Sequence, residues 1–297
     1  MRKVLLYWNH ICILHNQEKL FLKELQTQLK AQGIDLEIQF FGLGYTEHMS
    51  DYLRRNDAIL PDMIVSADLE VYEDSRIYNK LKKSLYPLRE QAKLKSGRAL
   101  EVVDRGVALL PYVAIPLVYY TSDPTCCQDK ELIEIEGMTF GGINNSAGKT
   151  IVKAVWNRYG KERVADFIEK AKIYDMPINS FVETRKGINE IALVPSLYAM
   201  RADNKNFYQC VPKEGPILIP SYICARNTIS LDVAQYIIGE LFSAKWSDFY
   251  RQKGDLILYP PIATNHSWID LQQYFVPEKE WLEKTTAEEF YELYDVI

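Results

Sequence analysis

The stretch GGINNSAGKT (141–150) comes nearest in this sequence to a known chemical motif, because it ends in Gly148-Lys149-Thr150 like a phosphate-binding loop. A P-loop needs a glycine and then four residues before its Gly-Lys-Ser/Thr. Counting back from Gly148, the required glycine position is occupied by Ile143, and a β-branched residue does not adopt the positive φ that the loop needs there. The spacing therefore excludes a nucleotide-hydrolysing P-loop.

The same stretch fits a strand over 138–143, a polar turn and a helix that begins near Ser146. Asn144, Asn145 and Ser146 are all favoured N-cap residues. Uncapped amides at a helix start can bind an anion, and Lys149 in the first turn would favour negative charge further. The alternative is a well-capped helix that binds nothing.

Two other groups of residues could hold a metal or do redox chemistry. His10 and Cys12 would share one face of a strand, but His15 falls in the next loop, so a hydrogen-bonding role for His10 is favoured over a metal site. Cys126-Cys127 is either a redox-active pair or simply two thiols. The five cysteines are scattered and odd in number, which argues against a disulfide framework.

Catalytic sets are not evident. Four histidines do not allow a Ser-His-Asp or Cys-His arrangement to be placed. Asp62 and Asp68 could be catalytic only beside a base, and the sequence shows none nearby. We therefore predict no catalytic residue, no resident metal and no cofactor.

Length and composition describe an ordinary globular chain. The chain has 297 residues, so two domains are expected, and 47% of them are hydrophobic and 25% charged. A net charge of −5 argues against a nucleic-acid partner. No apolar run is long enough to cross a bilayer, and the N-terminus shows neither an export signal nor a lipobox. Localisation is left open between export after removal of a leader and the cytoplasm.

Strand and helix patterns alternate along the chain. In the first part they predict a strand over 4–8, a helix over 18–32, a strand over 34–40, a helix over 46–55 and a strand over 63–66. This alternation indicates a mainly parallel sheet with crossover helices, in which ligands lie outside the carboxyl ends of the strands.

The second part restarts the alternation after a different kind of strand. Residues 113–120 are apolar and contain Pro116, which predicts an edge strand or a segment that crosses between domains. The pattern then predicts two helices over about 146–171, a buried strand within 187–200 that enters a Pro-Ser turn, a turn at 212–216 and a last helix from Ser230.

Five segments in this order resemble the extracellular solute-binding proteins of ABC transporters, which have the type II periplasmic-binding-protein fold. They are PDMIVSADLEVYED (61–74), PYVAIPLVYY (111–120), the stretch 144–171, PKEGPILIP (212–220) and the stretch 229–254. The members most similar to it handle iron, polyamines or phosphonates. Iron binders of this family use neighbouring tyrosines of the second domain. Here Tyr119-Tyr120 lies in the crossing strand and Tyr198 stands alone, so an iron site does not carry over.

The resemblance implies two α/β lobes, each a mixed sheet flanked by helices, that close on a ligand between them. Lobe 1 would comprise 1–115 and 225–297, and lobe 2 would comprise 116–224. The crossing strands would lie near 111–120 and 212–224.

Ligand contacts are expected from the strand-to-helix turns of both lobes. In lobe 1 we expect Trp8, Asn9, His10, Gly44, Tyr45, Ser66 and Asp68. In lobe 2 we expect Asn145, Ser146, Ala147, Gly148, Ser196, Tyr198 and Tyr222. Trp8 and Tyr45 would either stack on the ligand or pack between the lobes. The stretch 141–150 would then cradle a carboxylate, phosphonate or oxyanion.

The expected function is the capture of a small anionic or metal-containing solute, without chemistry, as the binding component of an ABC-type uptake system. Its partners would be the solute and an ABC permease, and the chain is expected to be a monomer. An enzyme or a cytoplasmic ligand sensor on the same two-lobed fold remains the alternative.

Overall fold

A computed structural model describes residues 1–11, 14–42, 44–92, 98–142, 145–254, 256–258 and 273–295. Its strands join in one mixed sheet in the order β2-β1-β3-β9-β4-β7-β5-β6, and β8 and β10 pair with β4. These strands are β1 (Arg2–Asn9), β2 (Ile34–Phe41), β3 (Met63–Ser66), β4 (Leu110–Thr121), β5 (Thr139–Gly141), β6 (Lys172–Tyr174), β7 (Ile191–Pro195), β8 (Tyr208–Cys210), β9 (Ile217–Ala225) and β10 (Ile257–Leu258).

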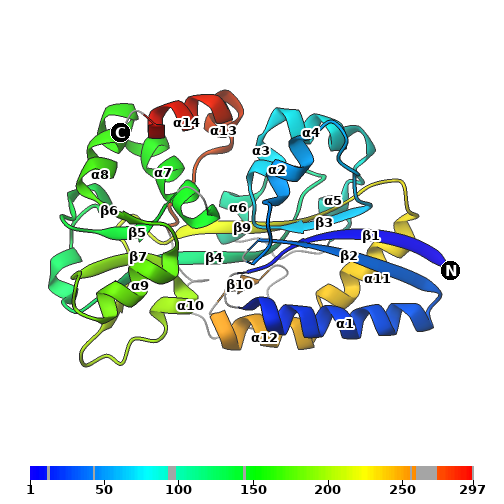
Figure 1. Ribbon diagram of the computed structural model, residues 1–297, viewed down its shortest axis with the longest axis horizontal. Coiled ribbons are helices and arrows are strands. Elements are labelled where there is room, and N and C mark those ends of the chain that lie inside the picture. The colour runs from blue at the N-terminus through cyan, green and yellow to red at the C-terminus, as the bar shows by residue number, and fades with distance from the viewer. Residues whose placement is uncertain are drawn as a thin grey trace.

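The sheet has two parallel parts joined by antiparallel strands. At one end β1 pairs in parallel with β2 and β3, and at the other end β5 pairs in parallel with β6 and β7. Between them β4 and β9 pair antiparallel with each other, with β9 joined to β3 and β4 joined to β7. Figure 1 shows these two long strands running from one lobe of the molecule to the other. The two-lobed α/β fold expected from the sequence is confirmed.

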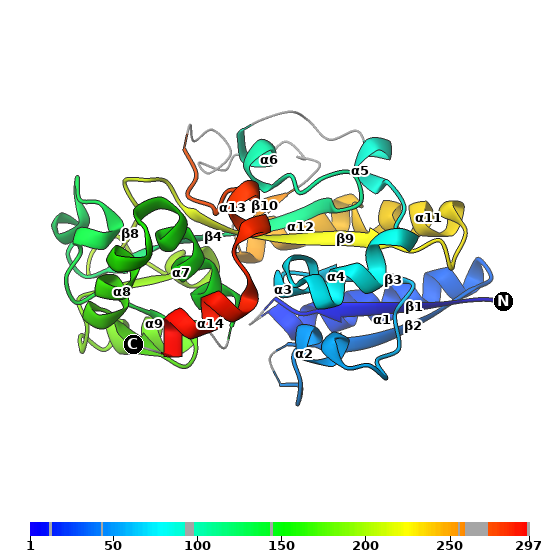
Figure 2. The same ribbon diagram turned by 90° about the horizontal axis from the view of Figure 1, so that it is seen from above.

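Helices cover the sheet of each lobe (Figures 1 and 2). Around β1–β3 lie α1 (His15–Ala31), α2 (Met49–Arg54), α3 (Glu70–Glu73), α4 (Ser75–Leu81), α11 (Leu231–Leu241) and α12 (Ala244–Gly254). Around β5–β7 lie α7 (Ser146–Tyr159), α8 (Lys161–Lys170), α9 (Pro177–Arg185) and α10 (Ser196–Ala199). The short α5 (Leu88–Gln91) and α6 (Arg98–Val103) precede β4.

The local patterns are mostly confirmed. Helix α1 buries Leu22, Leu25 and Leu29 on one face, as the 3.6-residue spacing predicts, and Gly33 with φ of 77° follows its end. The buried strand predicted within 187–200 is β7, and the chain leaves the sheet at the predicted Pro195-Ser196 turn and continues as α10. The last predicted helix is likewise two helices, α11 and α12.

Pro116 lies in the centre of the sheet and not at its edge. All of β4 is buried, and Pro116 is paired with Leu218 of β9 on one side. On its other side β10 pairs with Val113 and Ala114, and β7 begins to pair at Leu117. Among the described residues, only Leu218 of β9 is paired with Pro116, so no other described pairing there requires the N–H that a proline lacks. Of the two interpretations, the crossing segment is the one observed.

The C-terminal helices α13 (Lys279–Lys284) and α14 (Ala287–Asp295) pack against the lobe of α7 and α8. The rings of Trp156 in α7 and Trp281 in α13 lie 5.4 Å apart, and α14 contacts α8 (Figure 2). The sequence-based division placed this segment in lobe 1. The lobe boundaries themselves stay a prediction, and we propose to count 273–295 with lobe 2 on the basis of these contacts.

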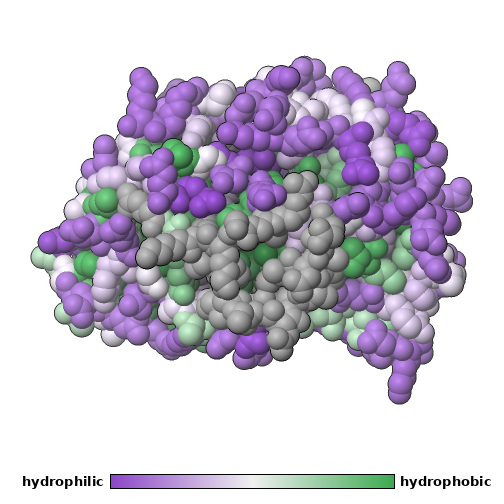
Figure 3. Space-filling model, turned by 180° about the vertical axis from the view of Figure 1, so that it is seen from behind, coloured by the Kyte–Doolittle hydropathy of each residue, from purple (hydrophilic) through white to green (hydrophobic). Residues whose placement is uncertain are grey.

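Hydrophilic residues form most of the outer rim in the view from behind (Figure 3). Within the described ranges, no helix combines the length and the apolar character needed to span a bilayer.

Candidate functional site

A cavity of about 310 Å³ lies between the two lobes. The carboxyl ends of the parallel strands in both lobes open into it, as expected for this kind of sheet. From lobe 1 it is lined by residues that follow β1, β2 and β3, namely Asn9, His10, Ile11, Gly42, Gly44, Tyr45, His48, Ala67 and Asp68. From lobe 2 it is lined by Asn145, Ser146, Ala147, Lys149, Asp175, Met176, Pro177, Pro195 and Leu197. Ile115 of β4 and Ile219 of β9 complete the lining.

Eight of the predicted ligand-binding residues lie at this cavity: Asn9, His10, Gly44, Tyr45, Asp68, Asn145, Ser146 and Ala147. The structure thus brings together, from distant parts of the sequence, the turns after β1, β2, β3 and β5. Their contact with a ligand remains a prediction. Asn144, which belongs to the same predicted turn, lies outside the described residues.

Three predicted residues of lobe 1 and the interlobe strands lie elsewhere. Trp8 is a core residue whose ring packs 5.6 Å from that of Trp246, so it packs inside lobe 1 and does not line the cavity. The buried Ser66 hydroxyl accepts a hydrogen bond from the amide of Asp68 at 2.9 Å. The Tyr222 hydroxyl donates to the carbonyl of Val103 at 2.6 Å.

Three predicted residues of lobe 2 are also turned away. The buried hydroxyl of Ser196 donates to the carbonyl of Gly254 at 2.7 Å, and the Tyr198 ring stacks 5.6 Å from that of Phe181. Gly148 packs against β5, where a Cβ would lie 2.1 Å from the carbonyl oxygen of Gly142. The prediction took whole turns as ligand contacts, but successive side chains of a turn point in different directions and only some reach the cavity.

His10 is held rigidly at the wall of the cavity. Its Nδ1 lies 2.9 Å from Oε2 of Glu18, and its ring stacks on the rings of Phe40, at 4.8 Å, and Tyr45, at 6.0 Å, which also contact each other. Glu18 is fully buried and also accepts from the amide of Ile11 at 3.0 Å.

The other oxygen of Glu18 accepts from the hydroxyl of Tyr250 at 2.8 Å, so the carboxylate is bound on both sides. A carboxylate at Nδ1 keeps the proton on that nitrogen and leaves Nε2 as the reactive atom of the ring. Nε2 of His10 is buried and has no hydrogen-bond partner among the described residues. It can accept a hydrogen bond or bind a metal when the ring is neutral, and it can donate to an anion when the ring is charged.

The start of α7 faces His10 from the opposite lobe. The Asn145 side chain caps the helix by accepting from the Gly148 amide at 3.0 Å, and its amide nitrogen donates to the carbonyl of Gly142 at 2.6 Å. The predicted N-cap is therefore confirmed, but this side chain is already engaged. Amides in the first turn of a helix have no partner within the helix, so Ser146 and Ala147 are the residues here that can offer N–H donors to the cavity.

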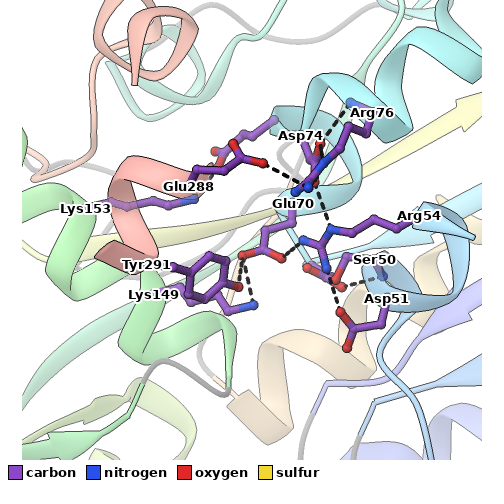
Figure 4. Close-up of polar contacts among 12 residues, drawn as sticks. Ser50, Asp51, Arg54, Glu70, Asp74, Arg76, Lys149, Lys153, Glu288 and Tyr291 are labelled. Atoms are coloured by element: carbon purple, nitrogen blue, oxygen red, sulfur yellow. Dashed lines mark hydrogen bonds and ion pairs between the residues drawn. The ribbon is translucent and has the colours of Figure 1, made fainter. Parts of the chain in front are cut away.

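Lys149 does not present a free charge to the cavity. Its ammonium lies 3.0 Å from Oε1 of Glu70 in α3, on the other lobe (Figure 4). Burial alone would lower the pKa of Lys149, but the charges of Glu70 and Asp68 outweigh this effect and raise it. The expectation that Lys149 would attract an anion is corrected, because its charge is neutralised by the protein.

Known structures are similar to this chain over nearly its whole length. The ferric binding protein from Campylobacter jejuni has a TM-score of 0.69 at 12% identity, covering 99% of this chain and 98% of that one. Iron-bound HitA from Pseudomonas aeruginosa has 0.63 at 16% identity, covering 100% and 98%. A two-component-system protein that mediates signal transduction has 0.68 at 15% identity, covering 98% and 99%.

The fold is that of the periplasmic binding proteins. At these identities the likeness concerns the fold. No protein-family model and no curated protein matches the sequence.

Within the periplasmic-binding-protein fold, two functional features escape sequence reasoning. Glu18 and Tyr250 fix His10, yet Tyr250 comes from 232 positions further along the chain. Glu70 binds Lys149 across the lobes, and the sequence marks it only as one acid among many. The signal that could have found Glu18 is its place in the first turn of α1, the first helix after β1 and His10.

A metal group is not apparent in the part of the chain that the structure covers. The rings of His10 and His15 lie 6.2 Å apart, and Cys12 is outside the described residues. Among the residues described, no three or more His, Cys, Asp or Glu side chains are grouped to hold a metal ion.

Proposed function

We propose that this chain is a solute-binding protein that closes its two lobes on a small anionic or metal-containing solute. One observation carries the proposal: His10 of one lobe, whose buried side chain leaves Nε2 without a hydrogen-bond partner among the described residues, lies at the same cavity as the helix-start residues Ser146 and Ala147 of the other lobe. A ligand that contacts both His10 and the start of α7 would link the two lobes. Its binding energy would then favour the closed arrangement.

The residues that line the cavity favour a solute that contains both a metal cation and an anionic group. His10, Asp68 and Asp175 at this cavity are residue types that bind cations, whereas the amides of Ser146 and Ala147 at the start of α7 are of the kind that bind anions. A cavity of about 310 Å³ accommodates a small complex. Two similar structures support this class, the iron-bound HitA and a substrate-binding domain of a putative molybdenum ABC transporter from Clostridium difficile, which has a TM-score of 0.52 at 13% identity.

Delivery to an ABC permease is the function that the similar transporter proteins favour. The second candidate is a ligand sensor, which the similarity to the two-component-system protein favours. Both functions need the same cavity and the same closure. Catalysis is the least supported, since Nε2 of His10 has no nucleophile or second titratable group bonded to it among the described residues.

The test is direct binding, by calorimetry and thermal shift, of ferric citrate, ferric ion, molybdate, phosphate and zinc to metal-free protein. We expect one of them to bind with one-to-one stoichiometry and without turnover. His10→Ala should weaken that binding by more than about tenfold, because an uncompensated ligand contact in a closed cavity is lost. Tyr236→Ala, which removes an exposed ring of α11 that does not line the cavity, is the control and should change affinity by less than about threefold.

Two results would contradict the proposal. One is that none of these solutes binds to protein whose circular dichroism shows it folded. The other is that His10→Ala and Tyr236→Ala bind the solute with equal affinity. Turnover of any bound compound would favour an enzyme instead.

A further inference from the structure

Three thiols gather at the end of β4, in lobe 2 and away from the interlobe cavity. Strand β8 pairs with this end so that Cys210 lies opposite Tyr119. Directly after β4 the chain turns into a 3₁₀ helix, Pro124–Cys127, which contacts β8. The turn therefore brings Cys126 and Cys127 against Cys210, although 83 positions separate Cys127 from Cys210 (210 − 127).

The turn that carries Cys127 is well held. The carboxylate of Asp123 accepts from the amide of Thr125 at 2.9 Å, and the hydroxyl of Thr121 donates to the carbonyl of Glu190 at 2.9 Å. Cys126 is bonded to this frame, since its sulfur lies 3.5 Å from the Thr121 hydroxyl. The side chain of Cys127, in the same turn, is buried.

Cys127 and Cys210 line one surface cavity together, and both carry free thiols. This cavity has a volume of about 400 Å³, includes Lys213, and shares no lining residue with the interlobe cavity. Hydrogen bonding from Cys127 lowers the pKa of Cys210 to about 7, whereas the same contact raises the pKa of Cys127. Cys210 is partly exposed, so a reactive thiolate is accessible from solvent.

A buried cysteine elsewhere provides the contrast. Cys224 lies in the middle of the sheet, in β9, and burial raises its pKa to about 12. Among the described residues no other thiol contacts Cys224, and its side chain is closed to solvent. We therefore expect Cys224 not to react with thiol reagents.

We propose that Cys210 and Cys127 form a reversible disulfide, with Cys210 as the attacking thiol. In the first step the Cys210 thiolate attacks one sulfur of a low-molecular-weight disulfide, whose S–S bond breaks and whose other half leaves as a thiolate and takes up a proton. In the second step Cys127 loses its proton to solvent and attacks the Cys210 sulfur, which expels the second small thiol. The small disulfide is reduced to two thiols, and the protein pair is oxidised by two electrons.

The new bond would join the turn after β4 to β8, two segments that are both fixed to the same strand. Cys126 is not the partner, because its sulfur is directed to Thr121 and it does not line the shared cavity. The site is independent of the proposed solute binding and would be present whichever solute is found.

The experiment is a redox titration of the full chain with oxidised and reduced glutathione, followed by proteolysis and mass spectrometry. We expect a peptide pair linked through Cys127 and Cys210 in the wild-type protein and in Cys126→Ser, with the loss of two hydrogens, that disappears on reduction. Cys210→Ser should lack it. Absence of this pair in folded protein, or a link that needs Cys126, would overturn the proposal.

A second measurement does not depend on any variant. Reduced wild-type protein is alkylated with iodoacetamide over a series of pH values, and labelled peptides are quantified. Cys210 should react at least about tenfold faster than Cys224, with a rate that rises through pH of about 7. Equal labelling of the two cysteines would contradict the role of Cys210.

Discussion

The ammonium nitrogen of Lys149 lies 3.0 Å from Oε1 of Glu70, and this ion pair joins α7 of one lobe to α3 of the other. Glu70 also accepts from the Tyr291 hydroxyl of α14 at 2.6 Å and pairs with Arg54 of α2 (Figure 4). One turn further along, Lys153 pairs with Glu73 at 2.8 Å. The C-terminal helix and both lobes therefore meet at one buried carboxylate.

Removing the Lys149 charge should destabilise the protein. Lys149→Met leaves Glu70 bound to Arg54 and Tyr291 but without its charged partner from the other lobe, which should cost about 2 kcal/mol of unfolding free energy. Urea denaturation measures it. Lys186→Met is the control, because Lys186 and Glu183 form an exposed pair that should contribute less than about 0.5 kcal/mol. Equal losses in the two variants would show that the interlobe pair has no special weight.

Stability should fall in acid partly through Glu70. Burial would raise the pKa of this carboxyl, but Lys149 and the Tyr291 hydroxyl outweigh burial and lower it from 4.5 to about 2. A lowered pKa in the folded state means that the stabilisation is present above pH 4.5 and is lost as pH falls toward about 2.

A pKa shift of this size in Glu70 corresponds to about 3 kcal/mol of unfolding free energy. Glu70→Gln is less stable at neutral pH, but its unfolding free energy should decline less between pH 4.5 and about 2 than that of the wild type. Denaturation at a series of pH values compares the two slopes. Parallel curves would rule out Glu70 as a contributor.

Gly148 should not tolerate a methyl group. A Cβ there would lie 2.1 Å from the carbonyl oxygen of Gly142 and 2.2 Å from that of Gly141, so Gly148→Ala must displace the start of α7 from β5. We expect a loss of about 2–3 kcal/mol in thermal denaturation. Gly239→Ala is the matched control, since that glycine lies within α11 with no atom near its Cβ position. It should stabilise the protein by up to about 1 kcal/mol, and a loss there similar to that of Gly148→Ala would contradict the steric explanation.

Glu18 should act on the ligand through His10. Glu18→Gln places an amide N–H group among three hydrogen-bond donors, those of His10, Ile11 and Tyr250, and so releases the ring from its fixed orientation. We expect a loss of about 2 kcal/mol of stability and weaker binding of the solute. Tyr250→Phe removes one donor and leaves the bond to His10, so it should cost about 1 kcal/mol with unchanged affinity. Calorimetry on both variants measures solute affinity and unfolding separately, and so distinguishes the positioning of His10 from a general loss of stability. An equal loss of affinity in the two variants would refute the positioning role of Glu18.

Sequence patterns were sufficient for much of the fold because they act over short distances. The apolar spacing of Leu22, Leu25 and Leu29 follows the helical repeat whatever surrounds it, and the polar turn before Ser146 is capped by Asn145 as its type predicts. The two-lobed fold and the turns at which the cavity is found were implied by the resemblance of five segments to the solute-binding proteins of ABC transporters.

Which side chains reach the cavity depended on the tertiary structure. Trp8 and Asn9 are neighbours in sequence, yet one packs into the core and the other lines the cavity. Lys149 meets Glu70 because β9 and β4 lie between the two parallel parts of the sheet and fix how the lobes are joined. Glu18 meets Tyr250 inside lobe 1 and Cys127 meets Cys210 inside lobe 2, where segments distant in sequence pack together. Local spacing specifies helices and strands through contacts a few residues apart, whereas these pairs form between distant segments whose approach is set by strand order and packing.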